Sequence, residues 1–232
     1  MLGGVLDRGV GTFDDALRRP RRQVANALAD FVRHSTSEKA ERTLNVRGPL
    51  LKRAVSAAKQ VANHRAPLLP AWQRFDGVVW KHLDPATLTP DERARILVPS
   101  GLYGVSTSDD LIADFRLRMN VRLPAIGNVA TFWRTRLIAA MAPAVDGATI
   151  VNLLPKEHDA ALDLVGLGAI ATVINVNFTH GDGAAAAGHD AKAVKGVLAR
   201  SLVDSGADVL ASFEWAGWRA SAGADGVVIA GP

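Results

Sequence analysis

The sequence contains no cysteine, a single tyrosine and no apolar run long enough to cross a membrane. The absence of cysteine excludes disulfides, thiolate metal ligands and cysteine nucleophiles, and it is typical of a cytoplasmic protein. A membrane-spanning helix needs about 20 apolar residues, and residues 1–7 lack the basic and apolar regions of a signal peptide. We therefore expect a cytoplasmic protein without a membrane partner, and nothing in the sequence predicts its oligomeric state.

The familiar motifs of nucleotide and hydrolase chemistry are also missing. There is no Walker loop, dinucleotide fingerprint or nucleophile elbow. The group His180, Asp182, His189 and Asp190 contains metal-ligating residue types, but no pair has a familiar spacing on a rigid element. We expect neither a cofactor nor a metal.

The charge that is present is unevenly distributed along the 232 residues. Residues 1–75 contain 14 Lys and Arg against 6 Asp and Glu, a net charge of +8, whereas the remaining residues contain 13 against 17, a net charge of −4. A basic segment of this kind favours a polyanionic partner such as nucleic acid. Helices with solvated basic faces produce the same pattern.

Hydrophobic periodicity predicts one mixed α/β domain over residues 1–232, with a loose segment at residues 1–12. Helical spacing predicts helices over residues 13–34 (interrupted at Pro20), 50–64, 129–141 and 192–202. Apolar runs predict strands over residues 96–98, 148–153 and 172–178, and a short strand or buried turn over residues 76–80. We expect a single mixed sheet surrounded by helices.

The first candidate site follows the predicted strand 96–98, where a glycine-flanked tyrosine, Tyr103, precedes Asp110 and Arg116. Arginine presents a planar fork of donors that suits phosphate or carboxylate. Aspartate orients such a fork or acts as a base, and tyrosine donates to an oxyanion. The same three residues would equally form a structural ion pair beneath a loop.

The second candidate site lies at the start of the predicted helix 192–202. His189, Lys192 and Lys195 recur every third residue, so they lie near one face of the helix entrance. Two amines and an imidazole there predict an anion site, helped by the unpaired N–H groups of a helix N-terminus. A solvated basic helix face is the alternative. Asn152 with Glu157 and His158, after another strand, forms a weaker third group.

These residues also resemble a known family, the YaaA peroxide-stress proteins, over most of residues 63–218. The matching segments, in order, are Asn63-His64-Arg65-Ala66-Pro67, Phe75-Asp76-Gly77-Val78-Val79-Trp80, Ser100-Gly101-Leu102-Tyr103-Gly104, Asp110-Leu111-Ile112, Phe115-Arg116-Leu117, Trp133, Val151-Asn152-Leu153 with Glu157, His189 with Lys192, Lys195-Gly196 and Arg200, and residues 213–218. No single motif decides the match, but their order and spacing are specific.

The resemblance implies an α/β fold with a positively charged cleft and a helix-hairpin-helix-like element. It also implies DNA binding, including double-stranded DNA, and protection from oxidative damage by lowering free iron. Tyr103, Asp110, Arg116, His189 and Lys192 match shared polar positions, and we expect them to line one site as candidate catalytic residues. The expected anion-binding residues are Arg65, Arg116, Lys192 and Lys195.

The sequence departs from the family pattern at several positions. Residues 1–12 lack the Pro, Ser/Ala and Lys-bearing loop with which members open, so the chain resembles a diverged member. Phe115 stands where tyrosine is usual, and His158 where an aromatic hydroxyl is common. Residues 45–49 are the nearest candidate for the hairpin, and Pro49 makes it irregular.

Three functional hypotheses follow from these residues. The leading one is binding of DNA or another polyanion in peroxide stress, by neutralisation of phosphates. The alternative is a diverged pathway enzyme that acts on a small anionic, nucleotide-like or heteroaromatic substrate in the same cleft. The third is a protein-interaction module with a vestigial cleft.

Overall fold

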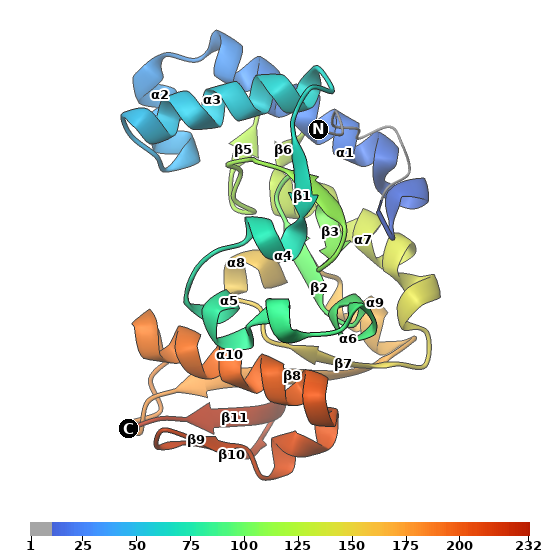
Figure 1. Ribbon diagram of the computed structural model, residues 1–232, viewed down its shortest axis with the longest axis vertical. Helices are drawn as coiled ribbons and strands as arrows, with labels where there is room; N and C mark the ends of the chain where they lie inside the picture. Colours follow the sequence, from blue (N-terminus) through green and yellow to red (C-terminus); the bar gives the residue numbers. More distant parts are fainter. Residues whose placement is uncertain (1–10) are drawn as a thin grey trace. The chain divides into compact units, whose positions relative to one another are not determined.

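The computed structural model describes residues 11–232, and Figure 1 traces their helices and strands. They form two compact units, which are described one at a time. Unit 1 comprises residues 11–74, 96–143 and 154–163, and unit 2 comprises Phe75–Arg95, Ala144–Leu153 and Leu164–Pro232. The mixed α/β class is confirmed, whereas the single domain stays a prediction. Most of the predicted loose segment lies outside the described residues.

Unit 1 combines helices with short antiparallel strand pairs. Its helices are α1 (Asp14–His34), α2 (Ser37–Leu44), α3 (Pro49–Ala62), α4 (Ala71–Arg74), most of α7 (Val129–Val145) and α8 (Lys156–Asp159). Its strand pairs are β1 (Leu68–Pro70) with β4 (Leu111–Ala113), β2 (Leu97–Ser100) with β3 (Gly104–Thr107), and β5 (Arg122–Leu123) with β6 (Gly127–Asn128).

Helix α1 runs without a break through Pro20, so the predicted interruption is wrong. A proline inside a helix removes one backbone hydrogen bond and costs about 3 kcal/mol. On either side of it, Leu17, Val24 and Leu28 recur at helical spacing and are almost completely buried. Each large buried side chain contributes roughly 1.5–3 kcal/mol, so the apolar face keeps the helix continuous. That face packs α1 against α3.

The β2–β3 hairpin requires glycine where it turns beneath α7. Gly104 has a φ of +71°, a left-handed conformation that glycine adopts without strain. A Cβ at this position would lie 2.8 Å from Cε3 of Trp133. Trp133 is fully buried, and its indole N–H donates a hydrogen bond to the carbonyl of Gly101 at 2.8 Å. The loop between the two glycines is therefore packed tightly in the core of unit 1.

Unit 2 is built on a five-stranded mixed sheet of order β7-β8-β11-β10-β9. Its strands are β7 (Thr149–Asn152), β8 (Thr172–Thr179), β9 (Glu214–Trp215), β10 (Trp218–Gly223) and β11 (Gly226–Ala230). β7, β8 and β11 are parallel, and β10 pairs antiparallel with β11 and β9. The strands predicted over residues 148–153 and 172–178 are thus confirmed.

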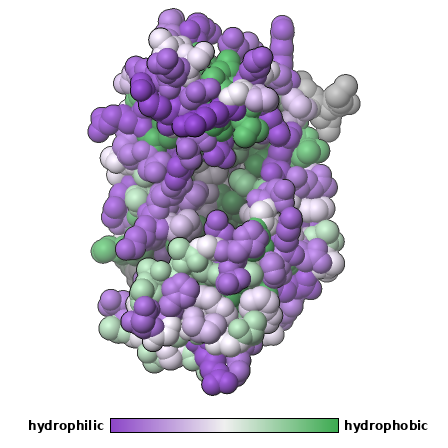
Figure 2. All heavy atoms as spheres, turned by 90° about the vertical axis from the view of Figure 1, so that its left-hand side faces the viewer, coloured by the Kyte–Doolittle hydropathy of each residue, from purple (hydrophilic) through white to green (hydrophobic). Residues whose placement is uncertain are grey.

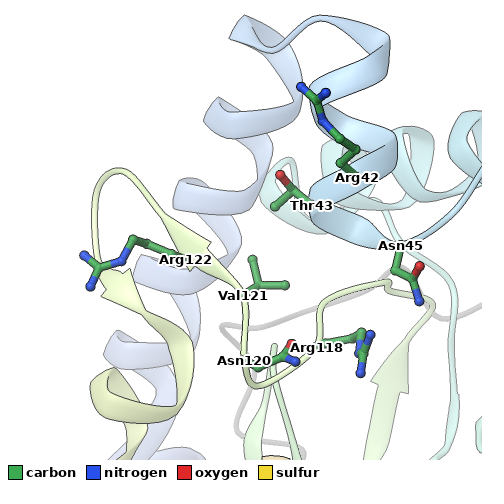
Figure 3. A pocket seen from close by; sticks show the side chains of 7 residues that line it. All are labelled: Arg42, Thr43, Asn45, Arg118, Asn120, Val121 and Arg122. Carbon is green, nitrogen blue, oxygen red and sulfur yellow. The ribbon is translucent and has the colours of Figure 1, made fainter.

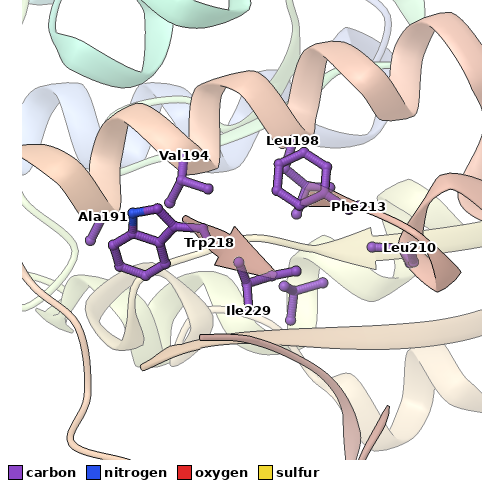
Figure 4. Packing of buried hydrophobic residues seen from close by; sticks show 8 residues of the cluster. Ala191, Val194, Leu198, Leu210, Phe213, Trp218 and Ile229 are labelled. Carbon is purple, nitrogen blue, oxygen red and sulfur yellow. The ribbon is translucent and has the colours of Figure 1, made fainter. Parts of the chain in front are cut away.

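Helix α10 (Gly188–Ser205) covers one face of this sheet (Figure 1). Figure 4 shows Val194 and Leu198 of α10 directed toward Trp218 and Ile229 of the sheet, and all four are almost completely buried. Val176 of β8 belongs to the same cluster. The alternation along β8 therefore places apolar residues against α10 and leaves Asn175 and Asn177 for the other face.

The short strand or buried turn predicted over residues 76–80 is wrong, because helix α5 (Val78–Leu83) begins there. A Cβ on Gly196 of α10 would lie 2.4 Å from the carbonyl oxygen of Val79, so the missing side chain allows α5 and α10 to approach closely. The other short helices of unit 2 are α6 (Pro90–Ala94), α9 (Leu164–Gly168), and the 3-10 turns η1 (Pro85–Thr87) and η2 (Ala207–Ala211). No helix within residues 11–232 is both long and apolar enough to cross a membrane.

Candidate anion-binding site

Tyr103 lies in the core of unit 1, with 4% of its surface exposed. Its hydroxyl accepts a hydrogen bond from the backbone N–H of Ala113 at 2.7 Å. Its ring meets Phe115 edge-on, with centroids 5.7 Å apart, and the guanidinium of Arg21 lies 5.6 Å from its centroid. Burial raises the pKa of Tyr103 to about 12, against the weaker effect of the Ala113 hydrogen bond. This phenol stays protonated at neutral pH.

Alkaline titration tests this environment directly, because Tyr103 is the only tyrosine and tyrosinate absorbs near 295 nm. We expect a midpoint of about 12 in the folded protein, against the ordinary 10. Because the folded state holds this proton more tightly than the unfolded state, the contribution of Tyr103 to stability is complete below pH 10. It is lost as the pH rises from about 10 to 12. Circular dichroism follows unfolding in parallel, and Tyr103→Phe removes the signal. A midpoint near 10 in folded protein would contradict this structure.

Asp110 lies at the turn between β3 and β4 and is 7% exposed. Its carboxylate accepts hydrogen bonds from both the backbone N–H and the hydroxyl of Thr107, at 2.9 and 2.8 Å. The backbone N–H and hydroxyl of Thr12 donate to it at 2.9 and 3.0 Å. Four donors therefore surround this carboxylate, and they tie the segment before α1 to the turn.

A buried ion pair, which the sequence analysis missed, lies beside these two residues. Arg21 is 3% exposed and donates to the carboxylate of Asp14. It also donates to the carbonyls of Tyr103 and Val105, at 3.0 and 2.7 Å. Burial lowers the pKa of Arg21, and the negative charges of Asp14 and Asp110 oppose this effect. The sequence contained one sign of this burial. Arg21 lies four residues after Leu17 and three before Val24, so it shares their buried face of the helix.

Arg116 is exposed, and its hydrogen bonds are long. It donates to the carbonyls of Leu44 and Asn45 at 3.4 Å, at the C-terminal end of α2. No hydrogen bond or ion pair within residues 11–232 joins it to Asp110. Tyr103 and Asp110 thus belong to a buried network, whereas Arg116 lies on the surface of unit 1. Arg65, another predicted anion-binding residue, is exposed just after α3.

Beside Arg116 lies a hollow of about 410 Å³, which we call the arginine hollow. Its lining residues come from α2 and the residue after it, the loop before β5, and β5 itself (Figure 3): Arg42, Thr43, Asn45, Arg118, Asn120, Val121 and Arg122. Nε and Nη2 of Arg118 donate to the two carboxylate oxygens of Glu157, at 3.3 and 2.5 Å. These hydrogen bonds lower the pKa of Glu157 and raise that of Arg118.

The second predicted group lies on α10 in unit 2. His189 and Lys192 are exposed in the first turns of the helix, and Lys195 is half-buried. The amine of Lys195 lies 4.9 Å from the ring centroid of Phe178, and burial lowers its pKa. No carboxylate within residues 11–232 forms a salt bridge with it. The prediction that this group and Tyr103, Asp110 and Arg116 line one cleft stays a prediction.

Metal-ligating side chains do not gather in the part of the chain that the structure describes. No three His, Asp or Glu residues of that part lie close enough together to hold an ion.

Comparison with known proteins decides the family. A family model described as "Peroxide stress protein YaaA" matches residues 12–223. The chain belongs to the YaaA peroxide stress protein family. Its curated relatives are named UPF0246 proteins. That of Dinoroseobacter shibae is 33% identical over 182 residues, covering 73% of this chain and 67% of the relative.

Two further relatives of the YaaA-family chain are matched over a smaller share of their length. The UPF0246 protein of Cereibacter sphaeroides strain ATCC 17025 is 30% identical over 62% of this chain and 59% of its own length. That of Streptomyces coelicolor is 30% identical over 59% of this chain and 54% of its own length. The chain thus spans between about half and two thirds of these relatives.

Proposed function

We propose that this YaaA-family protein binds duplex DNA through the backbone phosphates as part of the response to peroxide stress. The observation that carries the proposal is an excess of exposed cations on α1–α3 and the adjoining turns. Seven of these cations are exposed and have no ion pair within residues 11–232: Arg19, Lys39, Arg42, Arg47, Lys52, Lys59 and Arg65. Unpaired lysine and arginine side chains neutralise phosphates and release bound counterions.

Three of the five acidic residues within residues 11–75 are paired with arginines, which leaves Glu38 and Glu41 against the seven cations. Asp14 is buried against Arg21, and the exposed Asp15 and Asp30 pair with arginines three residues away. Figure 2 shows that hydrophilic side chains dominate the surface over α2 and α3. This surface suits a hydrated, charged partner better than an apolar one.

The turn between α2 and α3 resembles a hairpin between two helices, at residues 45–49. Asn45 and Gly48 have positive φ angles, of 52° and 55°. The N–H of Gly48 donates to the carboxylate of Glu41 at 3.3 Å, and the N–H of Val46 to the carbonyl of Glu41 at 3.2 Å. Because the N–H groups of Val46 and Gly48 are already hydrogen-bonded, we expect side chains such as Arg42 and Arg47 to contact the phosphates.

Binding of a short duplex DNA at several salt concentrations tests the proposal. If about five of the seven cations meet phosphates, log affinity falls linearly with log salt with a slope of about −4.5. Two duplexes of unrelated sequence should bind about equally, because phosphate contacts carry little sequence information. The absence of a complex at micromolar protein and low salt would refute the proposal.

A small-molecule enzyme is the second candidate function, favoured by Lys195. A half-buried ammonium group without a carboxylate is stabilised by a bound anion, and a depressed pKa also suits an amine that transfers protons. Lys192 and His189 lie on the same helix. On this proposal, α10 would bind an anionic substrate. A protein that fails to bind DNA but whose Lys195 is protected from amine-modifying reagents by a small anion would favour this alternative.

A further inference from the structure

We propose that the arginine hollow of unit 1 is a binding site for a phosphate group. The backbone of duplex DNA is the source that the proposed function implies, and this assignment of the source rests on that function. Among the lining residues of the hollow, Asn45 belongs to the hairpin candidate at residues 45–49, and the others lie outside the sequence motifs.

The lining of the hollow is matched to an anion. Three arginines and two asparagines are among its seven lining residues, and none of the seven carries a carboxylate. Each guanidinium presents a planar fork that matches the oxygens of phosphate, and each amide adds donors. Val121 is the only apolar side chain of the set. An apolar ligand would leave these donors unpaired.

Arg118 is held in place before any ligand arrives. Its two hydrogen bonds to Glu157 use Nε and Nη2, so the plane of the guanidinium is set by α8. Nη1 makes no hydrogen bond within residues 11–232 and stays available to a ligand. A preorganised donor loses less conformational entropy on binding than a mobile one. Glu157 lies outside the lining and offsets only one of the three positive charges.

The other two arginines of the hollow are mobile arms. Arg42 of α2 and Arg122 of β5 are exposed and form no ion pair within the described part of the chain. Figure 3 shows them on different sides of the hollow with their guanidinium groups directed outward, and Arg118 and Asn120 on the loop between. Both side chains can turn onto an anion without breaking a bond. Arg116, beside Asn45, adds positive charge at the rim.

The test compares two double variants that remove the same charge. Arg42→Gln with Arg122→Gln removes the two exposed arginines of the hollow, whereas Lys81→Gln with Lys156→Gln removes two exposed lysines that neither line it nor belong to the seven cations proposed to meet phosphates. All four residues are exposed, so melting temperatures should stay close to wild type. With duplex DNA, the slope of log affinity against log salt should be less negative by about 1.8 for the hollow variant. Its affinity should fall at least tenfold. The control variant should change both much less.

A second measurement uses inorganic phosphate alone. Wild-type protein should melt at a higher temperature in sodium phosphate than in sodium chloride of equal ionic strength, and the hollow variant should lose this difference. Wild type that binds no DNA, but is stabilised by phosphate only when the hollow is intact, would support a site for free phosphate. In that case only the proposed DNA-binding function would be refuted. If hollow and control variants behave alike in both measurements, the proposed phosphate site is refuted.

Discussion

Arg21→Met should destabilise the protein by about 3–5 kcal/mol, because it leaves the buried carboxylate of Asp14 without its counter-charge. The substitution also removes the donor to the carbonyls of Tyr103 and Val105. For a protein of this size, the expected fall in melting temperature is roughly 6–20 °C. Differential scanning calorimetry or thermal circular dichroism measures it.

The matched control for this substitution is Arg19→Met. Arg19 is exposed, lies on the same helix and forms no ion pair within residues 11–232, so its replacement should change stability by less than about 0.5 kcal/mol. Adding Asp14→Leu to Arg21→Met removes the buried charge and should restore part of the lost stability, since the penalty of an unpaired carboxylate disappears. Equal melting temperatures for the two single arginine variants would show that the buried pair does not hold α1 in place.

Asp110→Asn should destabilise the protein by about 3 kcal/mol, because four donors from Thr12 and Thr107 surround the carboxylate. An amide has only one acceptor oxygen. Its NH₂ group is itself a donor, so it would face the donors of Thr12 or Thr107 without forming a hydrogen bond. Hydrogen bonds to a charged acceptor contribute about 1.5–3 kcal/mol each, so partial rearrangement still leaves a large loss. Chemical denaturation with a constant m-value measures the change.

Asp15→Asn is the control for this second substitution. Asp15 is fully exposed, and within residues 11–232 its one ion pair is with Arg18 at 3.5 Å, so its loss should be close to neutral. The comparison also bears on the prediction that Asp110 is catalytic. If Asp110→Asn melts like wild type, the carboxylate does not organise this turn, and a role in binding or chemistry gains weight.

Local patterns along the chain predicted much of the architecture. The helices over residues 13–34 and 129–141 and the strands over residues 148–153 and 172–178 were recognisable, because side-chain burial repeats at 3.6 residues in helices and at two in strands. The basic character of residues 1–75 and the family resemblance were likewise readable without coordinates. The eight-residue helix α2 was missed, since it spans only about two turns and buries only Ala40 and Leu44.

The sequence by itself therefore determined the α/β class, the family and the cationic surface, since these depend on composition, periodicity and ordered motifs. Only the tertiary structure decided the environment of each polar residue. Arg21 meets Val105 across 84 positions, and Arg118 meets Glu157 across 39. No local pattern encodes such pairings, because they arise when distant segments pack together. For the same reason Tyr103 and Asp110 lie in a buried network, whereas Arg116 lies exposed beside the arginine hollow.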